Sequence, residues 1–370
     1  MSVAPVTRSQ VLGFRVRAQQ LDRDALGLDD AAVLDIGVQD TGPDGAGWAL
    51  SNRGVDMSAP SRDELVMVWT IRGAPHVYRR EDLPLVAAAV EPFSEADAGK
   101  RIFDATKPLK AAGISSLDAL DAVAGAMRSV VTRPMAKGEV STQVTALMDQ
   151  PYLRFCRVCK ATHLYEMPFR LAALRAGLEL EADTSPPVLR PVPGFERAAR
   201  TPLRYDVIRA YLRLLGPATP KHVAAYIDAP VKDVTALWPA DLVEVSVEGE
   251  IRWLLSADAS GLTSERVKTT RLLAPFDLFL QARDRPTLVD DPARAKALWP
   301  VLGRPGAVLI DGEIAGMWRP RKLGKHFRVQ VELWDTVSSS IREAISEQAE
   351  RLAAYRQVPL SGIDLEGALT

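Results

Sequence analysis

The residues best suited to binding a metal are two cysteines and a histidine in the pattern Cys156-x-x-Cys159-x-x-x-His163. On a helix these three side chains would share one face. A closed zinc site needs four ligands. No second Cys or His pair completes this one, because the other histidines are isolated: His76, His222 and His326. Most lone cysteines are buried free thiols, so the sequence predicts no bound metal and no cofactor.

Several motifs of familiar enzyme chemistry are missing from the sequence. It has no Gly-x-x-x-x-Gly-Lys-Ser/Thr phosphate loop, no Gly-x-Gly-x-x-Gly fingerprint and no Gly-x-Ser-x-Gly elbow. A zinc deaminase would need His-x-Glu and Pro-Cys-x-x-Cys, and neither occurs. These absences weigh against conventional NTPase, dinucleotide-dependent, esterase and deaminase functions.

The clearest basic segment runs from Trp318 to Arg328 and contains no acidic residue. Aromatic residues near both ends and an internal glycine fit a hairpin loop that lies against a phosphate backbone. The alternative is a solvated loop between two strands. Because the positive charge is concentrated while the whole chain is nearly neutral, we favour nucleic-acid contact. The predicted DNA-binding residues are Arg319, Arg321, Lys322, Lys325 and Arg328, with Arg72 on an earlier hairpin as a lesser candidate.

A third candidate is the polar break Gln39-Asp40-Thr41, which follows an apolar helical segment and Gly37. The same residue types are common in loops and helix caps. Composition alone therefore favours a structural role for these three residues over a functional one.

The composition is typical of a globular protein without membrane segments. The 370 residues suggest two or three domains, and the contents of 47% hydrophobic and 25% charged residues are ordinary. Two cysteines argue against a disulfide framework, and neither a signal peptide nor a run of about 18 apolar residues is found. The net charge of −1 leaves any attraction to nucleic acid to local patches. We expect a cytoplasmic monomer.

Residues 203–255 show the most complete structural pattern. Two helices separated by Gly216-Pro217, a third helix from Val231 to Trp238, and two alternating strands about Glu248-Gly249 are predicted. Helix, helix, helix and hairpin make a winged helix, whose third helix commonly enters the DNA major groove. Here Lys232 is the only cation on that helix. The unit is therefore either a DNA-contacting module or a spacer between such modules.

The same order of elements is predicted less clearly in the earlier part of the chain. In the first unit, helices from residue 9 onwards precede strands at 65–71 and 76–78. In the second unit, a helical pair at 141–148 and 152–162 precedes a weak hairpin at 169–180.

The segment after residue 261 is predicted to be rich in strands. We expect a hairpin turning at Asp311-Gly312, a further strand and a closing amphipathic helix from Val337 to Tyr355. The predicted fold is α+β, with winged helices at 1–115, 116–200 (including a proline-rich link) and 201–258, then a β-rich element at 259–370.

Five stretches together resemble a bacterial winged-helix DNA-binding family that includes the azinomycin-resistance (AlkZ-like) and YcaQ-type DNA glycosylases. They are 72–76, the 203–255 unit, 271–277, 281–285 and the hairpin at 308–318. The resemblance covers roughly residues 9–357. It implies tandem winged helices around a channel that fits double-stranded DNA, with a further barrel-like hairpin element.

In these glycosylases a Gln-x-Gln motif after the second helix is thought to position the water that attacks an alkylated purine nucleotide. Gln39 matches the first glutamine, Thr41 stands at the second, and Asp40 replaces a small or apolar spacer. The resemblance thus implies Gln39 and Asp40 as water-positioning residues and Thr41 as a supporting donor in base excision from alkylated or crosslinked DNA. The alternatives are a non-catalytic DNA-binding or regulatory protein and a protein-interaction scaffold.

Overall fold

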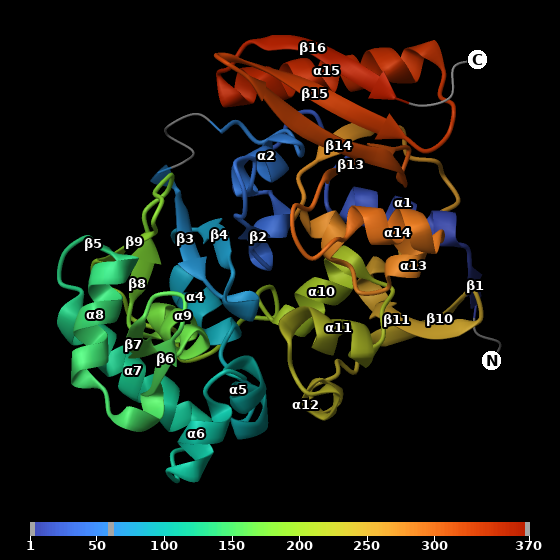
Figure 1. Cartoon of the computed structure of the whole chain (residues 1–370). Coiled ribbons are helices and arrows are strands. Elements are labelled where there is room, and N and C mark those ends of the chain that lie inside the picture. The colour runs from blue at the N-terminus through green and yellow to red at the C-terminus, as the bar shows by residue number, and fades with distance from the viewer. Residues whose placement is uncertain (1–3, 58–62, 367–370) are drawn as a thin grey trace.

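The protein has a mixed α+β fold, as predicted. The computed structural model describes residues 4–57 and 63–366, and within these ranges the strands form open sheets of six, five, three and two strands. Figure 1 shows two lobes, with α4 to α9 in one and α10 to α15 in the other, and β2 and α2 between them. In the described part of the chain, no helix is both long enough and apolar enough to cross a membrane.

The N-terminal elements belong to both lobes. They are β1 (Ala4–Val6), α1 (Arg8–Ala18), the 3-10 helix η1 (Ala32–Asp35), β2 (Val38–Gln39) and α2 (Ala46–Ser51). A capping box starts α1, in which Thr7 and Gln10 each bond the other's backbone N–H. Helix α1 packs against α10 in one lobe, while β2 pairs with a strand of the other.

The six-stranded sheet forms the centre of one lobe, in the order β2-β4-β3-β8-β9-β5. Its other strands are β3 (Leu65–Trp69), β4 (Pro75–Arg79), β5 (Met135–Ala136), β8 (Leu178–Leu180) and β9 (Val188–Pro191), with η2 (Ile71–Gly73) between β3 and β4. The helices of this lobe are α4 (Leu83–Ala89), α5 (Glu95–Arg101), α6 (Thr106–Ala111), α7 (Ser116–Val130), α8 (Lys137–Leu147) and α9 (Glu166–Arg175). Because Met67 of β3 pairs with Leu180 of β8, the segments predicted as the first two winged helices share one sheet.

The segment predicted as a helix at 152–162 is a β-hairpin instead. The 3-10 turn η3 (Gln150–Tyr152) leads into β6 (Leu153–Cys156), which pairs with β7 (Ala161–Leu164) across a four-residue turn. Lys160 in that turn has φ of 51°, which a helix would not permit. The weak hairpin predicted at 169–180 was also wrong, since residues 166–175 form α9.

The element order predicted for 203–255 is confirmed. It comprises α10 (Val207–Leu215), α11 (Pro220–Ile227), α12 (Val231–Ala236), β10 (Leu242–Val247) and β11 (Glu250–Leu255). The Asp206 carboxylate caps α10, and Asp228 in the left-handed conformation ends α11. Strand β1 adds to this hairpin in parallel with β10, which the sequence did not predict.

The C-terminal segment forms an open five-stranded sheet rather than a barrel-like element. The 3-10 helix η4 (Ser256–Gly261) precedes β12 (Thr270–Leu273), η5 (Leu278–Gln281), α13 (Arg285–Leu288), α14 (Pro292–Leu298) and β13 (Gly306–Ile310). Then follow β14 (Glu313–Leu323), β15 (His326–Leu333), α15 (Ser339–Arg356) and β16 (Leu360–Glu366). The predicted turn at Asp311-Gly312 and the closing helix are confirmed. Strand β16 lies parallel to β15 at one edge and β12 lies at the other, so the sheet does not close.

Buried ion pairs connect the N-terminal segment to the chain around residue 280. Arg15 and Arg252 both contact the Asp284 carboxylate, at 2.7 and 2.6 Å. Arg53 forms a two-pronged pair with Asp277, and both side chains are fully buried. A charge removed from water in this way must keep its partner, so these contacts fix where the two segments meet.

We predict that Arg53→Met destabilises the protein by about 3–5 kcal/mol, because Asp277 would remain buried without its partner. Urea denaturation measures the change. The matched control is Arg133→Met, whose pair with Glu139 is exposed and whose loss should cost under about 1 kcal/mol. Equal losses in the two variants would show that the buried pair does not hold these segments together.

Candidate functional site

The short strand β2 determines the orientation of the predicted catalytic residues. Val38 pairs with Val77 and Gln39 with His76 of β4, and the Asp40 N–H continues the pairing by donating to the Pro75 carbonyl. Side chains alternate along an extended segment, so Gln39 and Thr41 lie on one side and Asp40 on the other. The Gln39 amide donates to the Thr41 hydroxyl over 3.0 Å, which confirms that these two side chains lie together.

Residues from distant segments hold the Gln39 side chain. Its carbonyl oxygen accepts from Arg72 Nη2 at 3.4 Å and from Gln281 Nε2 at 3.3 Å. Arg72 also donates to the Tyr226 carbonyl and lies over the Tyr226 ring, 4.9 Å from its centre. The amide is therefore positioned by β2, η2, α11 and η5 together, and Gln281 and Tyr226 are site residues that the sequence analysis missed.

The surroundings of Arg72 are strongly positive. Burial, with a smaller contribution from the neighbouring Arg283 and Arg304, lowers the pKa of Arg72 to about 10, so the group is still a cation at neutral pH. Arg304 lies over the Phe276 ring at 4.6 Å. The buried Nε atoms of Arg283 and Arg304 have no hydrogen-bond partner within the described chain. The Gln281 to Arg285 stretch was recognised in the sequence only through the family resemblance.

Asp40 is not brought together with Gln39 and Thr41. Its carboxylate accepts from the Ala46 N–H at 2.8 Å, at the start of α2, and lines a cavity of about 490 Å³ together with Arg80, Arg190 and Tyr355. Burial is the main cause that raises the pKa of Asp40 above its ordinary value. The contacts are those of a residue that orders the turn into α2.

The basic segment 318–328 consists of the end of β14, a tight turn and the start of β15. Three of its cations contact protein acceptors: Arg319 donates to the Gly303 carbonyl, Arg321 to Gln330 Oε1, and Arg328 pairs with Asp364 at 2.8 Å. Lys322 and Lys325 are exposed and have no side-chain partner in the described part of the chain. Arg72, by contrast, lies beside Gln39, so the predicted DNA-binding residues fall into two separate groups.

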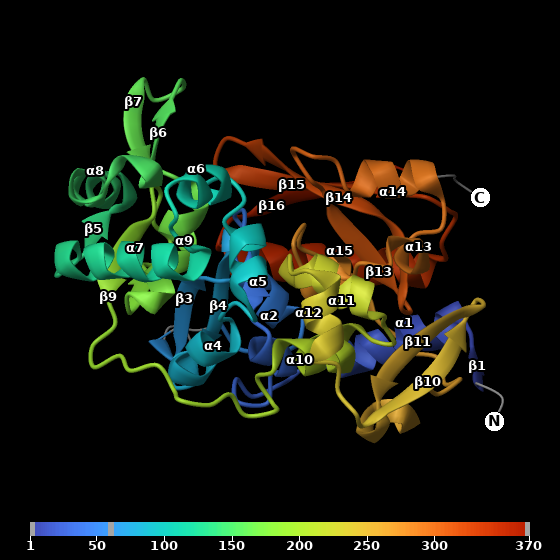
Figure 2. The ribbon, with the colours of Figure 1, turned by 90° about the horizontal axis from the view of Figure 1, so that it is seen from below.

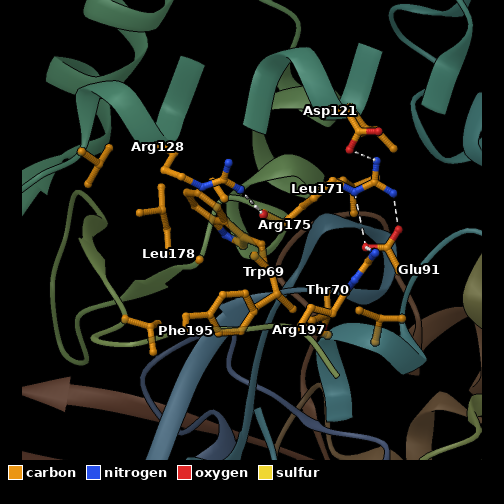
Figure 3. A pocket seen from close by; sticks show the side chains of 18 of the residues that line it. Trp69, Thr70, Glu91, Asp121, Arg128, Leu171, Arg175, Leu178, Phe195 and Arg197 are labelled. Atoms are coloured by element: carbon orange, nitrogen blue, oxygen red, sulfur yellow. Dashed lines mark hydrogen bonds and ion pairs between the residues drawn. The ribbon is translucent and has the colours of Figure 1, made fainter. Parts of the chain in front are cut away.

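A cavity of about 720 Å³ lies between β3, α7 and α9, with Trp69 and Thr70 on its wall. Figure 3 shows Arg175 between Glu91 and Asp121, and Arg197 also pairs with Glu91, at 2.8 Å. The charged side chains of Arg175, Arg197 and Glu91 are therefore already paired with one another or with Asp121. Thr70 and Trp69 precede the Arg72 turn, but no hydrogen bond of the described residues joins this cavity to Gln39.

The fold and the sequence both match a class of DNA repair proteins. Residues 33–355 match the family described as DNA glycosylase AlkZ-like. The fold is similar to the solved structure of the Streptomyces sahachiroi DNA glycosylase AlkZ, with a TM-score of 0.72 and 19% sequence identity, over 98% of this chain and 100% of that chain. No protein with a curated description matches the sequence.

The structure and the match together place the protein among the DNA-repair glycosylase-like proteins. The chain belongs to the AlkZ-like DNA glycosylase family, as the resemblance predicted.

The pH dependence of folding provides a test of the packing beneath Gln39. His76, which pairs with Gln39 across the strands, is buried, and burial lowers its pKa from 6.5 to about 3, with Arg72 contributing. As the pH falls from 6.5 towards 3, His76 therefore becomes protonated in the unfolded chain but stays neutral in the folded chain. The free energy of unfolding falls over the same pH range.

We predict that the wild type loses up to about 1.4 kcal/mol per pH unit more than His76→Phe in this window, the slope for one proton. Urea denaturation at a series of pH values measures both slopes. Above pH 6.5 the two proteins should show parallel curves. Parallel curves in the acidic window as well would mean that His76 is not held neutral.

Proposed function

We propose that this protein is a DNA glycosylase that releases positively charged, alkylated purines from duplex DNA as a monomer. The observation that carries the proposal is the pairing of Gln39 with Thr41 on one side of β2, with the Gln39 amide fixed by Arg72 and Gln281. Two polar side chains held two residues apart on an extended segment can bind one water molecule between them. Family membership supports the same reaction class.

The reaction demands little of the protein. An alkylated ring nitrogen makes the base cationic, so when the glycosidic C1′–N bond breaks, its electron pair neutralises the leaving purine. Water then bonds to C1′ and loses a proton to solvent. The Thr41 hydroxyl oxygen, held in place by the Gln39 amide, accepts one hydrogen of that water, and this orients the oxygen lone pair towards C1′ while the other hydrogen faces solvent. No strong base is required when the leaving group is already activated.

The arginines near Gln39 are proposed to bind the DNA backbone. Arg72, Arg283 and Arg304 act electrostatically as one positive group. The guanidinium groups of Arg283 and Arg304 match phosphate oxygens, whereas Arg72 donates to Gln39 and the Tyr226 carbonyl. Lys322 and Lys325 at the β14–β15 turn add a second contact to the DNA backbone. Together they orient a duplex so that one nucleotide reaches Gln39.

Helix α12 acts as the spacer in this proposal. Asp233 accepts from the Ser94 hydroxyl at 2.6 Å, and Lys100 donates to the Ala229 carbonyl just before α12. Since Ser94 and Lys100 belong to the other lobe, these contacts join α12 to α5. A helix engaged in this way, with Lys232 as its only cation, is poorly suited to reading a major groove.

We predict that Gln39→Ala lowers the single-turnover rate of 7-methylguanine release from duplex DNA roughly a hundredfold, because the attacking water loses its position. DNA affinity should stay nearly unchanged, since Gln39 itself contacts no phosphate in this proposal. Thr41→Val should lower the rate about tenfold, and Thr41→Gln, which restores the family motif, should keep or raise it.

Asp40→Asn is the matched control, because its amide oxygen can still accept from Ala46 while the charge is removed. Its rate should equal that of the wild type. If the wild type at micromolar concentration releases no base but still binds DNA, the non-catalytic DNA-binding function replaces this one. If Asp40→Asn is as slow as Gln39→Ala, the assignment of the water site is wrong.

The backbone contact is tested separately by the salt dependence of DNA affinity. Each phosphate contact contributes about 0.9 to the slope of log K against log salt concentration. Lys322→Ala combined with Lys325→Ala should lower this slope by about 1–2, whereas Lys107→Ala combined with Lys110→Ala on α6 should not change it. An unchanged slope in the first variant would remove the β14–β15 turn from the DNA interface.

A further inference from the structure

The hairpin of β6 and β7 collects the two cysteines and a histidine at one place. Figure 2 shows this hairpin projecting from its lobe beyond α8. The potential ligand atoms of Cys156, Cys159 and His163 all lie within 4.8 Å of one another. We propose that these three residues bind a zinc ion and that a water molecule occupies the fourth position. This inference does not depend on the proposed glycosylase activity.

The strand register explains why the three side chains meet. His163 pairs with Arg154, so its side chain is on the same face as Cys156 and diagonal to it across the hairpin. Cys159 returns to that face because Lys160 adopts the left-handed conformation, with φ of 51°, and closes the turn. Two sulfurs on one tetrahedral zinc ion are separated by about 3.7 Å, so side-chain rotations alone would complete the site.

The three side chains also suit zinc chemically. Two cysteine thiolates would neutralise the charge of the metal ion, and one imidazole and one water molecule would complete a tetrahedral set of ligands.

His163 is held in the tautomer that a metal requires. Its Nδ1 lies 2.7 Å from the Leu164 carbonyl, which can only accept, so Nδ1 carries the hydrogen. Nε2 is then left with its lone pair free for a metal. A histidine that binds zinc commonly donates its other ring N–H to a backbone carbonyl in this way.

From the sequence, these residues were expected to be buried thiols on a helix, and both expectations are wrong. Cys156 is partly exposed and Cys159 is exposed. Phe155 and Val158 beside them are also exposed, at 65% and 92%, so the hairpin end buries little apolar surface. A two-stranded hairpin is marginally stable by itself, and a metal that joins its turn to β7 would supply the missing stabilisation.

The test uses the full chain, without a histidine tag and with its thiols kept reduced by a phosphine. After chelation and buffer exchange, Zn²⁺ is titrated in competition with a chromophoric chelator, and Co²⁺ serves as a spectroscopic probe. We expect one ion per chain, thiolate-to-cobalt charge transfer in the near ultraviolet, and the intense visible bands of a tetrahedral centre. Binding should also raise the melting temperature.

Cys156→Ser and Cys159→Ser should each weaken zinc binding by more than about a hundredfold and reduce the charge-transfer band to about half, and His163→Ala should weaken binding at least tenfold. His326→Ala, an exposed histidine elsewhere, is the matched control and should bind normally. Absence of zinc binding by the reduced wild type at micromolar concentration would overturn the proposal. So would zinc binding that survives when both cysteines are replaced. Base release by these variants is measured in parallel, and its loss or retention bears only on the glycosylase proposal.

Discussion

The geometry of the candidate site depends on the register of one very short strand. A shift of β2 by one residue would exchange its two sides and place Asp40 where Gln39 and Thr41 now lie. Two features hold the register: Val38 is buried, and Gly37 has φ of 89° directly under the Tyr78 ring, where any Cβ would collide. The glycine before the polar triplet is therefore as important to the site as the triplet, because it sets which residues face which way.

Arg72 connects Gln39 to residues that are distant in the sequence. The residue has φ of 58°, unusual for a side chain of its size, and this conformation lets the guanidinium reach Gln39, Gln281 and the Tyr226 carbonyl at once. Desolvation of the cation costs stability, and several acceptors offset that cost. The same ion also concentrates positive charge in a chain whose net charge is only −1. Arg72 therefore positions the Gln39 amide, and in the proposed function the same charge attracts the DNA.

The parts of the fold that could be predicted from the sequence are those with local signals. The 203–255 unit and the Asp311-Gly312 turn were predicted because caps, glycines and hydrophobic periods specify them within a few residues. The helix predicted at 152–162 is wrong, because two short strands, 153–156 and 161–164, pair across a tight turn there. The association of Gln39 with Gln281 could not be predicted, because 242 residues separate them and only tertiary packing brings them together. The orientation of Asp40 could have been predicted. In an extended segment residues 39 and 41 face the same side, so the residue between them faces the other side.

Among the residues that the structure describes, no carboxylate joins the Gln39 hydrogen-bond network, and this fits the proposed reaction. Departure of a cationic purine moves positive charge from the base to the sugar, so the total charge of the reacting nucleotide does not change. A neutral amide and a hydroxyl can hold water through that change without themselves being charged or titrated. The negative charge that steadies the sugar can come from the DNA phosphates, and the arginines around Arg72 would hold those phosphates in place. In this arrangement the DNA phosphates supply the negative charge near the sugar, and the protein holds the water molecule and the phosphates in position. A neutral base would gain no such assistance, which limits the reaction to lesions that have already activated the glycosidic bond.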